Sequence, residues 1–369
     1  MTKKIIKRAL LIIAGLILLV ALVLGVYILY IQLQYYRIDD NLALDVENAQ
    51  TEKLDDDGKY SVMTYNIGFG AYNHDFSFFM DSGTMKDGTA VAGTMSRAQS
   101  VDIVNENTSG AISAMQNADA DFYFLQEVDR DATRSHHIDQ TALVRGAFAD
   151  YGYTYAQNFH SAYLAYPLYE MHGKVDAGLV TLSRYEVDSA VRRSYPVDTS
   201  FFTKFFDLDR CFAVEYLPID GADAQLVLIN SHMSAYDEGG IIRAQQLELL
   251  FETAAAERAK GNYVIIGGDF NHVLGDGADI FETQQLTPEW VAKLSDDDLP
   301  SGFSIVHAEN ADKTATCRST DLPYEKGVNY TAVLDGFIIS DNIKATAENI
   351  DTDFAFSDHN PAKLTFEFK

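Results

Sequence analysis

The stretch YVIIGGDFNHVLG, residues 263–275, places polar side chains directly after a strand-like run. Its first four residues are aromatic or β-branched, so we predict a buried strand that ends at Gly267 and Gly268. Side chains that follow such a strand emerge at the carboxyl edge of a sheet, where open α/β sheets bind their ligands. Here they are Asp269, Asn271 and His272. An Asx turn, in which Asp and Asn bond to their own backbone, is the alternative interpretation.

Similar apolar runs recur along the chain and alternate with helical patterns. Strand-like runs begin near residues 60, 121, 178, 224, 332 and 364. Apolar positions at helical spacing predict helices within 97–116 and 240–260. Region 71–96 has no consistent period, and we predict a loop there that shapes access to a site. Strands and helices that alternate without a break indicate one layered α/β domain.

An apolar segment near the N-terminus, residues 9–31, is long enough to cross a bilayer as a helix. Residues 1–8 carry four cations, so the positive-inside tendency predicts that they form a cytoplasmic head. We therefore predict a single-pass protein of the cell membrane, with a transmembrane signal anchor at 9–31, a mobile tether at 32–58 and a folded domain outside the cell at 59–369. A cleavable signal peptide is the alternative, but its apolar region is usually about 7–15 residues long.

The chain is strongly acidic, with a formal net charge of −26 at pH 7. Such a surface repels nucleic-acid phosphates and anionic bilayers unless a metal or a local cationic patch intervenes. The same charge also favours solubility. Only two cysteines occur, Cys211 and Cys317, and the sequence assigns no disulfide between them.

Six strand-linked places along the chain each supply a carboxylate, an amide or an imidazole. They carry Asn66, Glu127, Asn230 with His232, Asp269 with Asn271, Asp335, and Asp358 with His359. Turn chemistry explains any single Asp or Asn, but six such places together indicate one shared site.

The motifs around these residues, taken in order, resemble the endonuclease/exonuclease/phosphatase superfamily. They are TYNIG at 64–68, LQEVD at 125–129, INSH at 229–232, GGDFN at 267–271, LDGFIIS at 334–340 and SDHNP at 357–361. The resemblance covers about residues 60–369 and implies a four-layer sandwich of two mainly antiparallel β-sheets flanked by helices. It also implies that the domain at 59–369 is catalytic and cleaves phosphate esters with a divalent metal, Mg²⁺ or alternatively Mn²⁺.

The resemblance implies metal ligands at three positions. Glu127 is the first of them, Asn66 supplies an amide oxygen, and Asp358 is an additional or water-mediated ligand. Oxygen ligands of this kind suit a hard cation such as Mg²⁺, which keeps several waters and needs only one or two carboxylates.

The resemblance also implies the catalytic residues. Asp269 is the implied base and is held in place by Asn271, whereas the pair of His359 and Asp335 is the alternative base. In the first case His359 contacts the scissile phosphate as a protonated imidazole and Asp335 fixes its orientation. His232 would stabilise charge that develops on the phosphate or on the leaving group.

Other polar residues near these motifs have weaker assignments. Arg210 matches an arginine that contacts substrate phosphate in relatives resembling deoxyribonuclease, and a surface salt bridge is its alternative role. Arg134, His136 and His137 follow Glu127 and are expected to line the rim of the site, with a solvated loop as the alternative for the two histidines. His272 is expected to be a supporting or loop residue.

The membrane anchor favours a phospholipid such as sphingomyelin as the substrate, because anchoring raises the local concentration of an enzyme at a bilayer. The aromatic segments 76–80 and 200–206 are interpreted as core, with loops that touch the membrane as the alternative. A surface nuclease or a phosphomonoesterase of the same superfamily is the alternative function, since acidic deoxyribonucleases exist in it. A catalytically silent binding module is the second alternative. The sequence indicates no protein partner.

Overall fold

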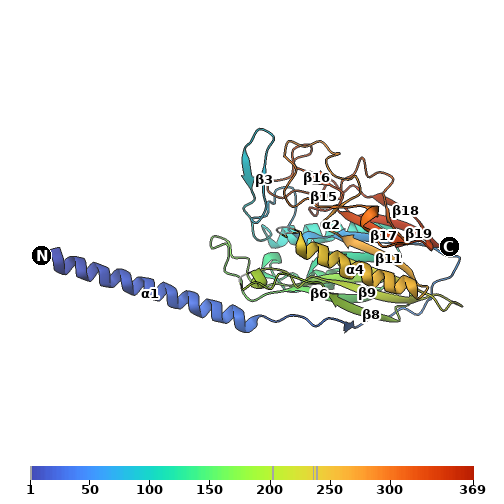
Figure 1. Ribbon diagram of the computed structural model, residues 1–369, viewed down its shortest axis with the longest axis horizontal. Coiled ribbons are helices and arrows are strands. Elements are labelled where there is room, and N and C mark those ends of the chain that lie inside the picture. Colours follow the sequence, from blue (N-terminus) through green and yellow to red (C-terminus); the bar gives the residue numbers. More distant parts are fainter. Residues whose placement is uncertain (1, 202, 236, 238–239) are drawn as a thin grey trace.

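The computed structural model describes residues 2–201, 203–235, 237 and 240–369, and its core is a pair of β-sheets packed face to face (Figure 1). The larger sheet has the strand order β1 (Leu42–Leu44), β8 (Ser189–Ser194), β9 (Cys211–Pro218), β10 (Gln225–His232), β11 (Tyr263–Asp269), β17 (Asp335–Ser340) and β14 (Phe303–Val306). The smaller sheet has the order β18 (Ile343–Asn349), β19 (Ala362–Phe368), β2 (Lys59–Asn66), β5 (Phe122–Asp129), β7 (Asp176–Ser183) and β6 (Gly152–His160). Neighbouring strands in both sheets are antiparallel, apart from the parallel pairs β10–β11 and β2–β5.

Helices and short hairpins surround the two sheets. The α-helices are α1 (Thr2–Gln34), α2 (Val101–Ala118), α3 (Gln140–Ala147) and α4 (Ile241–Ala259). The short strand pairs are β3 (Ser82–Thr84) with β4 (Ala90–Ala92), β12 (Val273–Leu274) with β13 (Lys293–Leu294), and β15 (Cys317–Arg318) with β16 (Thr331–Ala332). Short 3-10 turns lie at Gly68–Gly70, Thr133–Ser135, Thr203–Phe205 and Asp296–Asp298.

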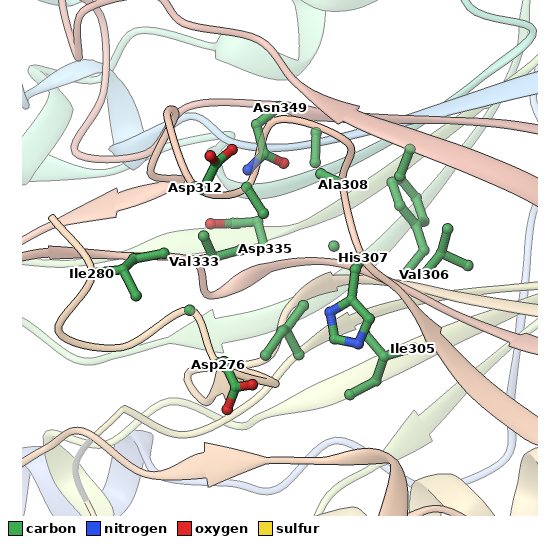
Figure 2. A pocket seen from close by; sticks show the side chains of 17 residues that line it. Asp276, Ile280, Ile305, Val306, His307, Ala308, Asp312, Val333, Asp335 and Asn349 are labelled. Carbon is green, nitrogen blue, oxygen red and sulfur yellow. The ribbon is translucent and has the colours of Figure 1, made fainter.

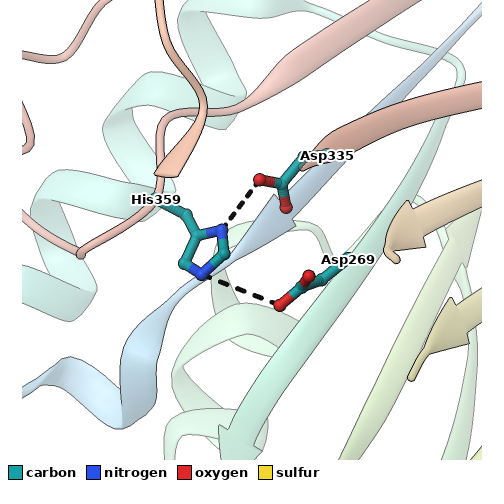
Figure 3. Close-up of side chains that lie close together, drawn as sticks. All are labelled: Asp269, Asp335 and His359. Carbon is teal, nitrogen blue, oxygen red and sulfur yellow. Dashed lines mark hydrogen bonds and ion pairs between the residues drawn. The ribbon is translucent and has the colours of Figure 1, made fainter. Parts of the chain in front are cut away.

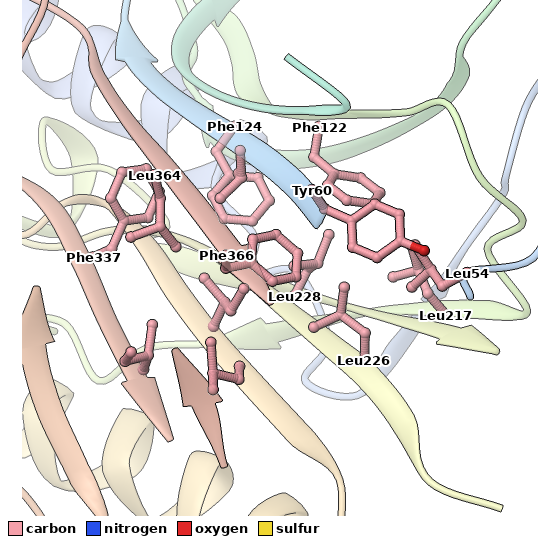
Figure 4. Packing of buried hydrophobic residues seen from close by; sticks show 14 of the residues in the cluster. Leu54, Tyr60, Phe122, Phe124, Leu217, Leu226, Leu228, Phe337, Leu364 and Phe366 are labelled. Carbon is pink, nitrogen blue, oxygen red and sulfur yellow. The ribbon is translucent and has the colours of Figure 1, made fainter. Parts of the chain in front are cut away.

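Alternation of side chains along the strands separates three apolar layers. The layer between the sheets includes Tyr60, Phe122, Phe124, Leu226, Leu228, Phe337, Leu364 and Phe366 (Figure 4). The layer under α2 and α3 includes Met63, Tyr65, Ala111, Met115, Tyr123, Leu125 and Val144. The layer under α4 includes Val227, Ile229, Leu250, Ala254, Val264 and Ile266. The expected four-layer α/β sandwich of two mainly antiparallel sheets is therefore confirmed.

The segment that follows α1 packs against the domain instead of hanging free. Leu42–Leu44 forms β1 and pairs with β8, and Glu47 exchanges backbone hydrogen bonds with Tyr153. Leu54 is fully buried between the sheets (Figure 4). The prediction of a mobile tether at 32–58 is therefore wrong for this stretch, because scattered apolar side chains anchor a segment whose average composition is polar.

The N-terminal helix α1 matches the expected membrane span in length and composition. Its most apolar part has a mean hydropathy of 3.2, and none of that part is buried against the domain. A signal sequence has the same properties, so α1 is a candidate transmembrane helix (Figure 1).

β11 continues to Asp269, one residue past the predicted end at Gly267 and Gly268, and Asp269 lies at the edge of the sheet as predicted. Gly268 has φ +146°, and a Cβ built on it would lie 1.9 Å from the carbonyl oxygen of Ser231 on β10. Glycine permits this close approach of two backbones, and the strand therefore carries Asp269 to the edge of the sheet.

We expect the stability of the domain to fall as the pH rises through about 7, because Glu215 is buried between the sheets. Thr154 Oγ1 donates to its Oε1 at 2.9 Å, but burial still raises the pKa of Glu215 from 4.5 to about 7. The folded chain binds this proton more tightly than the unfolded chain. The contribution of proton binding to the free energy of unfolding is therefore complete below about pH 4.5 and is lost as the pH rises through about 7.

The variant Glu215→Gln tests this expectation, because it keeps the shape and the acceptor but carries no charge. Denaturant unfolding in detergent should show it more stable than the wild type at pH 8, by up to about 3 kcal/mol, with a smaller difference at pH 5. Glu348→Gln, an exposed change on β18, supplies the baseline. A difference that is the same at both pH values would contradict the buried-acid explanation.

Candidate active site

Strand register brings three of the predicted residues into one row at the edge of the larger sheet. The parallel pair β10–β11 sets His232 opposite Asp269, and the antiparallel pair β11–β17 sets Asp269 opposite Asp335. Leu228 and Ile265 face the smaller sheet. Side chains an even number of residues away point the same way, so His232 and Asp269 also face the smaller sheet. The row therefore lies at the mouth of the gap between the two sheets.

The smaller sheet supplies Asn66 from the end of β2. Its Nδ2 donates across the gap to Asp269 Oδ2 at 3.0 Å and to Glu127 Oε1 at 3.3 Å. Its Oδ1 accepts from the backbone N–H of Gly68 at 3.0 Å. Asn66 thus faces the two carboxylates through its nitrogen, whereas the sequence led us to expect its oxygen.

A β-bulge in β5 aims Glu127 at the site. The register with β7 shifts between Leu125 and Val128, and Glu127 has φ +55°. Without the bulge, Glu127 would follow the alternation and point away from the gap, because Phe124 and Gln126 point into it. A bulge beside an active site commonly re-aims one side chain in this way.

Asp269 is the centre of the constellation. Its Oδ2 lies 3.0 Å from Asn66 Nδ2, 3.5 Å from His232 Nε2 and 3.7 Å from His359 Nε2, while its Oδ1 accepts from the Asn271 N–H at 2.9 Å. Burial disfavours the charged form, but His359, His232 and these hydrogen bonds outweigh it and hold the pKa of Asp269 below its usual value. Asp269 is therefore an ionised carboxylate.

His359 is held between two carboxylates (Figure 3). Its Nδ1 lies 2.8 Å from Asp335 Oδ2, and its Nε2 faces Asp269. Burial opposes the charge on the imidazole, yet Asp335 and its other acidic neighbours hold the pKa of His359 well above the usual value. The ligand atoms of these three residues lie within 4.8 Å of one another. We assign them to proton transfer, because each ring nitrogen of His359 faces a carboxylate.

His232 differs from His359 in charge. Burial and the nearby Arg210 lower the pKa of His232 to about 3, so its imidazole is neutral. Its Nδ1 is buried and has no hydrogen-bond partner among the described residues. The two histidines therefore flank Asp269 in opposite protonation states.

Arg210 is a buried cation with unused donors. The residue is 5% exposed, and neither its Nε nor its Nη1 has a hydrogen-bond partner in the described part of the chain. Its charge acts on both Glu127 and His232, so it lies beside the site. Free guanidinium donors in a buried place fit an anionic group such as a phosphate. The alternative of a surface salt bridge does not fit this burial.

Glu127 and Asp358 form the part of the site that fits a divalent cation. Both side chains remain partly exposed. Loss of hydration raises the pKa of each, and Asp358 raises that of Glu127 further by charge repulsion. The side-chain hydrogen bonds of the pair, from Asn66 and Ser357, are long at 3.3 Å. Two repelling carboxylates with few donors suit a hard cation that prefers oxygen ligands.

Asn271 and His272 lie beside Asp269 and make supporting contacts. The Nδ2 of Asn271 donates to the carbonyl of Met233 at 2.9 Å, so Asn271 positions the loop after β10, and its backbone N–H holds Asp269. His272 is buried, and its Nδ1 contacts the carbonyl of Phe270 at 2.7 Å. Asn271 therefore holds Asp269 through its backbone, and His272 contacts the neighbouring backbone.

The residues after Glu127 are also structural. Arg134 is buried, pairs with Asp129 at 2.8 Å and lies over the ring of Phe69. His136 contacts the carbonyl of Ala98 at 2.8 Å. His137 pairs with Asp131 on the surface, as a solvated loop would.

Sequence reasoning missed three supports of the site, namely Ser357, Arg318 and Gln126. Ser357 Oγ donates to the carbonyl of Asn66 at 2.7 Å and so ties the SDH motif to β2. Arg318 is a buried cation that acts on Asp358, and its stretch of sequence has no pattern that signals this role. Beneath the site, Gln126 Nε2 donates to Asn230 Oδ1 at 2.8 Å and joins the two sheets. Gln126 and Asn230 occur within LQEVD and INSH, so the motifs contained this signal.

A cavity of about 270 Å³ opens beside Asp335 (Figure 2). Its walls are mainly apolar and include Leu274, Ile280, Ile305, Val306, Val333 and Phe337. Asp335 is the one member of the catalytic row that lines it. The cavity therefore lies next to the reactive groups and does not contain them.

A family model described as the Endonuclease/Exonuclease/phosphatase family matches residues 63–359. No curated protein matches the chain in sequence. Among solved structures, TDP2 from C. elegans is similar, with 16% identity and a TM-score of 0.52 over 84% of this chain and 75% of that one. ANGEL2, described as a 2′,3′-cyclic phosphatase, has 17% identity and a TM-score of 0.52 over 89% and 98%. TDP2 from D. rerio, complexed with a single-strand DNA product, has 15% identity and a TM-score of 0.50 over 84% and 100%. At sequence identities this low, the structural likeness shows a shared fold and nothing beyond it.

Proposed function

The chain belongs to the endonuclease/exonuclease/phosphatase family, and from this membership we propose that it is a divalent-metal-dependent phosphodiesterase. The observation that carries the proposal is the ionised Asp269 beside the protonated His359 at the mouth of the gap between the sheets. An ionised base and a protonated acid that are present together at neutral pH support hydrolysis of an ester.

The proposed reaction begins when Asp269 accepts a proton from a water molecule. The water oxygen then forms a bond to phosphorus as the ester oxygen leaves, and His359 donates a proton to that leaving oxygen. Asp335 keeps His359 oriented and protonated, while the free donors of Arg210 bind the phosphate oxygens. A divalent cation held by Glu127 and Asp358 would supply neutralisation of the phosphate charge, Mg²⁺ being our first choice and Mn²⁺ the second.

We place the enzyme at the outer face of the cell membrane, with a phospholipid such as sphingomyelin as its substrate. The candidate membrane helix α1 and the cationic residues that precede its apolar run support this location. A nuclease is the alternative, since a structure of the same fold holds a DNA product. The net charge of −26 weighs against it, because nucleic-acid binding draws much of its affinity from Lys and Arg.

The test compares substrates on one preparation. The full chain in detergent or vesicles is given sphingomyelin, phosphatidylcholine, single-stranded DNA and double-stranded DNA with Mg²⁺, and EDTA and the variant His359→Ala serve as blanks. We expect headgroup release from a phospholipid that disappears in both blanks. Cleaved DNA with intact lipid would favour the nuclease. No metal-dependent product from any of these four diesters would favour a phosphomonoesterase or a silent binding module.

A further inference from the structure

The last turns of α1 are bound to a loop of the catalytic domain. The hydroxyl of Tyr27 accepts from the N–H of Ala165 at 2.9 Å and donates to the carbonyl of Tyr163 at 3.2 Å. The hydroxyl of Tyr30 accepts from the N–H of Tyr163 at 3.2 Å. Tyrosines at the end of a membrane span lie at the level of the lipid headgroups. This loop is therefore held at the same level.

The chain directly after α1 fixes the helix further. Tyr36 stacks on His160 with ring centroids 3.9 Å apart. Arg37 Nε lies 2.6 Å from Asp209 Oδ1, and the backbone N–H of Ile38 donates to the other oxygen of Asp209 at 2.7 Å. These contacts join the helix to the segment that leads into Arg210, so the domain keeps one orientation relative to α1.

Exposed apolar side chains gather beside these contacts. We call them the membrane rim: Tyr166, Leu168, Tyr169, Phe201 and Phe206. Leu168 is 79% exposed and Tyr169 is 71% exposed, which is unusual for large apolar residues in water. The aromatic segment 200–206 is interpreted from the sequence as core, and residue 202 within it lies outside the described residues. Of its other phenylalanines, Phe205 is buried while Phe201 and Phe206 are exposed.

The active-site edge of the sandwich faces the direction in which α1 projects. β19 is antiparallel to β2, so the C-terminus lies at the opposite end of the sandwich from Asn66 and the site. In Figure 1 the N-terminal end of α1 and the C-terminus lie at opposite extremes of the molecule. A bilayer crossed by α1 would therefore lie on the side of the domain that carries the site, and the C-terminus would lie on the far side.

We propose that the active-site edge faces the bilayer crossed by α1, with the membrane rim inserted among its headgroups. The partner is a lipid surface, and the phosphate that reaches the site belongs to a lipid of that same membrane. Arg210 lies four residues after Phe206, so one segment joins the rim to the phosphate-binding donors. The choice of substrate rests on the proposed phosphodiesterase, whereas the orientation rests only on α1 and the rim.

A depth probe tests the orientation without any need for catalysis. The full chain is reconstituted in phosphatidylcholine vesicles as Leu168→Cys, labelled with an environment-sensitive fluorophore and exposed to a quencher carried by the lipid chains. Both native cysteines are buried, so the label reports the introduced thiol. The matched control is Asp223→Cys, because residue 223 is exposed in the β9–β10 connection at the end of the sandwich opposite His232.

We expect the label at position 168 to shift to shorter wavelength and to be quenched by the lipid, while the label at position 223 remains in water. Equal, water-like emission from both positions would overturn the proposal. The double variant Leu168→Ser/Tyr169→Ser should hydrolyse a soluble phosphodiester at the wild-type rate and vesicle lipid about tenfold more slowly. If the wild type cleaves no ester at all, the proposed function fails, and the depth probe still decides the orientation.

Discussion

Asp269→Asn is expected to lower kcat for phosphodiester hydrolysis by about 10³–10⁴-fold, which is the contribution of a positioned general base. The change keeps the shape of the side chain and its acceptor for the Asn271 N–H. It removes the charge on which Asn66, His232 and His359 converge. The measurement is Mg²⁺-dependent hydrolysis of a soluble diester, so that access to a membrane has no influence.

The matched control for this change is Asp276→Asn. Asp276 is an exposed aspartate seven residues further along the chain, at the rim of the neighbouring cavity, and the same substitution there should leave kcat unchanged. Calorimetric titration with Mg²⁺ should show that Asp269→Asn still binds the metal, since Glu127 and Asp358 are intact. Activity within tenfold of the wild type would mean that Asp269 is not the base and would move that role to His359 with Asp335.

Much of the fold could be predicted because the long strands carry their own signal. β2, β5, β10 and β11 are apolar runs that end in a polar motif, and their positions are close to the predicted ones. β1 and the burial of Leu54 could not be predicted, because isolated apolar residues in an acidic segment have no local pattern. Their structure comes from tertiary contacts, because β1 pairs with the edge strand β8 and Leu54 packs into the core between the sheets.

The site, like the fold, has parts that the sequence predicts and parts that it does not. Alternation along β10 and β11 places His232 and Asp269 on one face, and the sequence predicted only that both belong to one shared site. The orientation of Glu127 depends on a bulge, which is set by pairing with β7 and is not visible in LQEVD. The protonation states depend on burial and on distances across the two sheets, so sequence reasoning left the choice of base open.

The coupling between His359 and Asp335 supplies the second large effect. His359→Ala is expected to lower kcat by about 10³-fold, because it removes the proton donor to the leaving oxygen. Asp335→Asn should cost about 10–100-fold, since His359 remains but loses the partner 2.8 Å away that orients it. The measurement is single-turnover hydrolysis of the soluble diester by each variant and by the double variant.

The double variant decides whether Asp335 acts through His359. If it does, Asp335→Asn has no further effect once His359 is alanine, so the double variant matches His359→Ala alone. Multiplied losses would mean that Asp335 acts independently, for example by supporting the neighbouring cavity that it lines. Unfolding midpoints of all three variants separate a loss of folded protein from a loss of chemistry. A general structural cost of burying Asn at position 335 would lower activity both in the wild type and in His359→Ala.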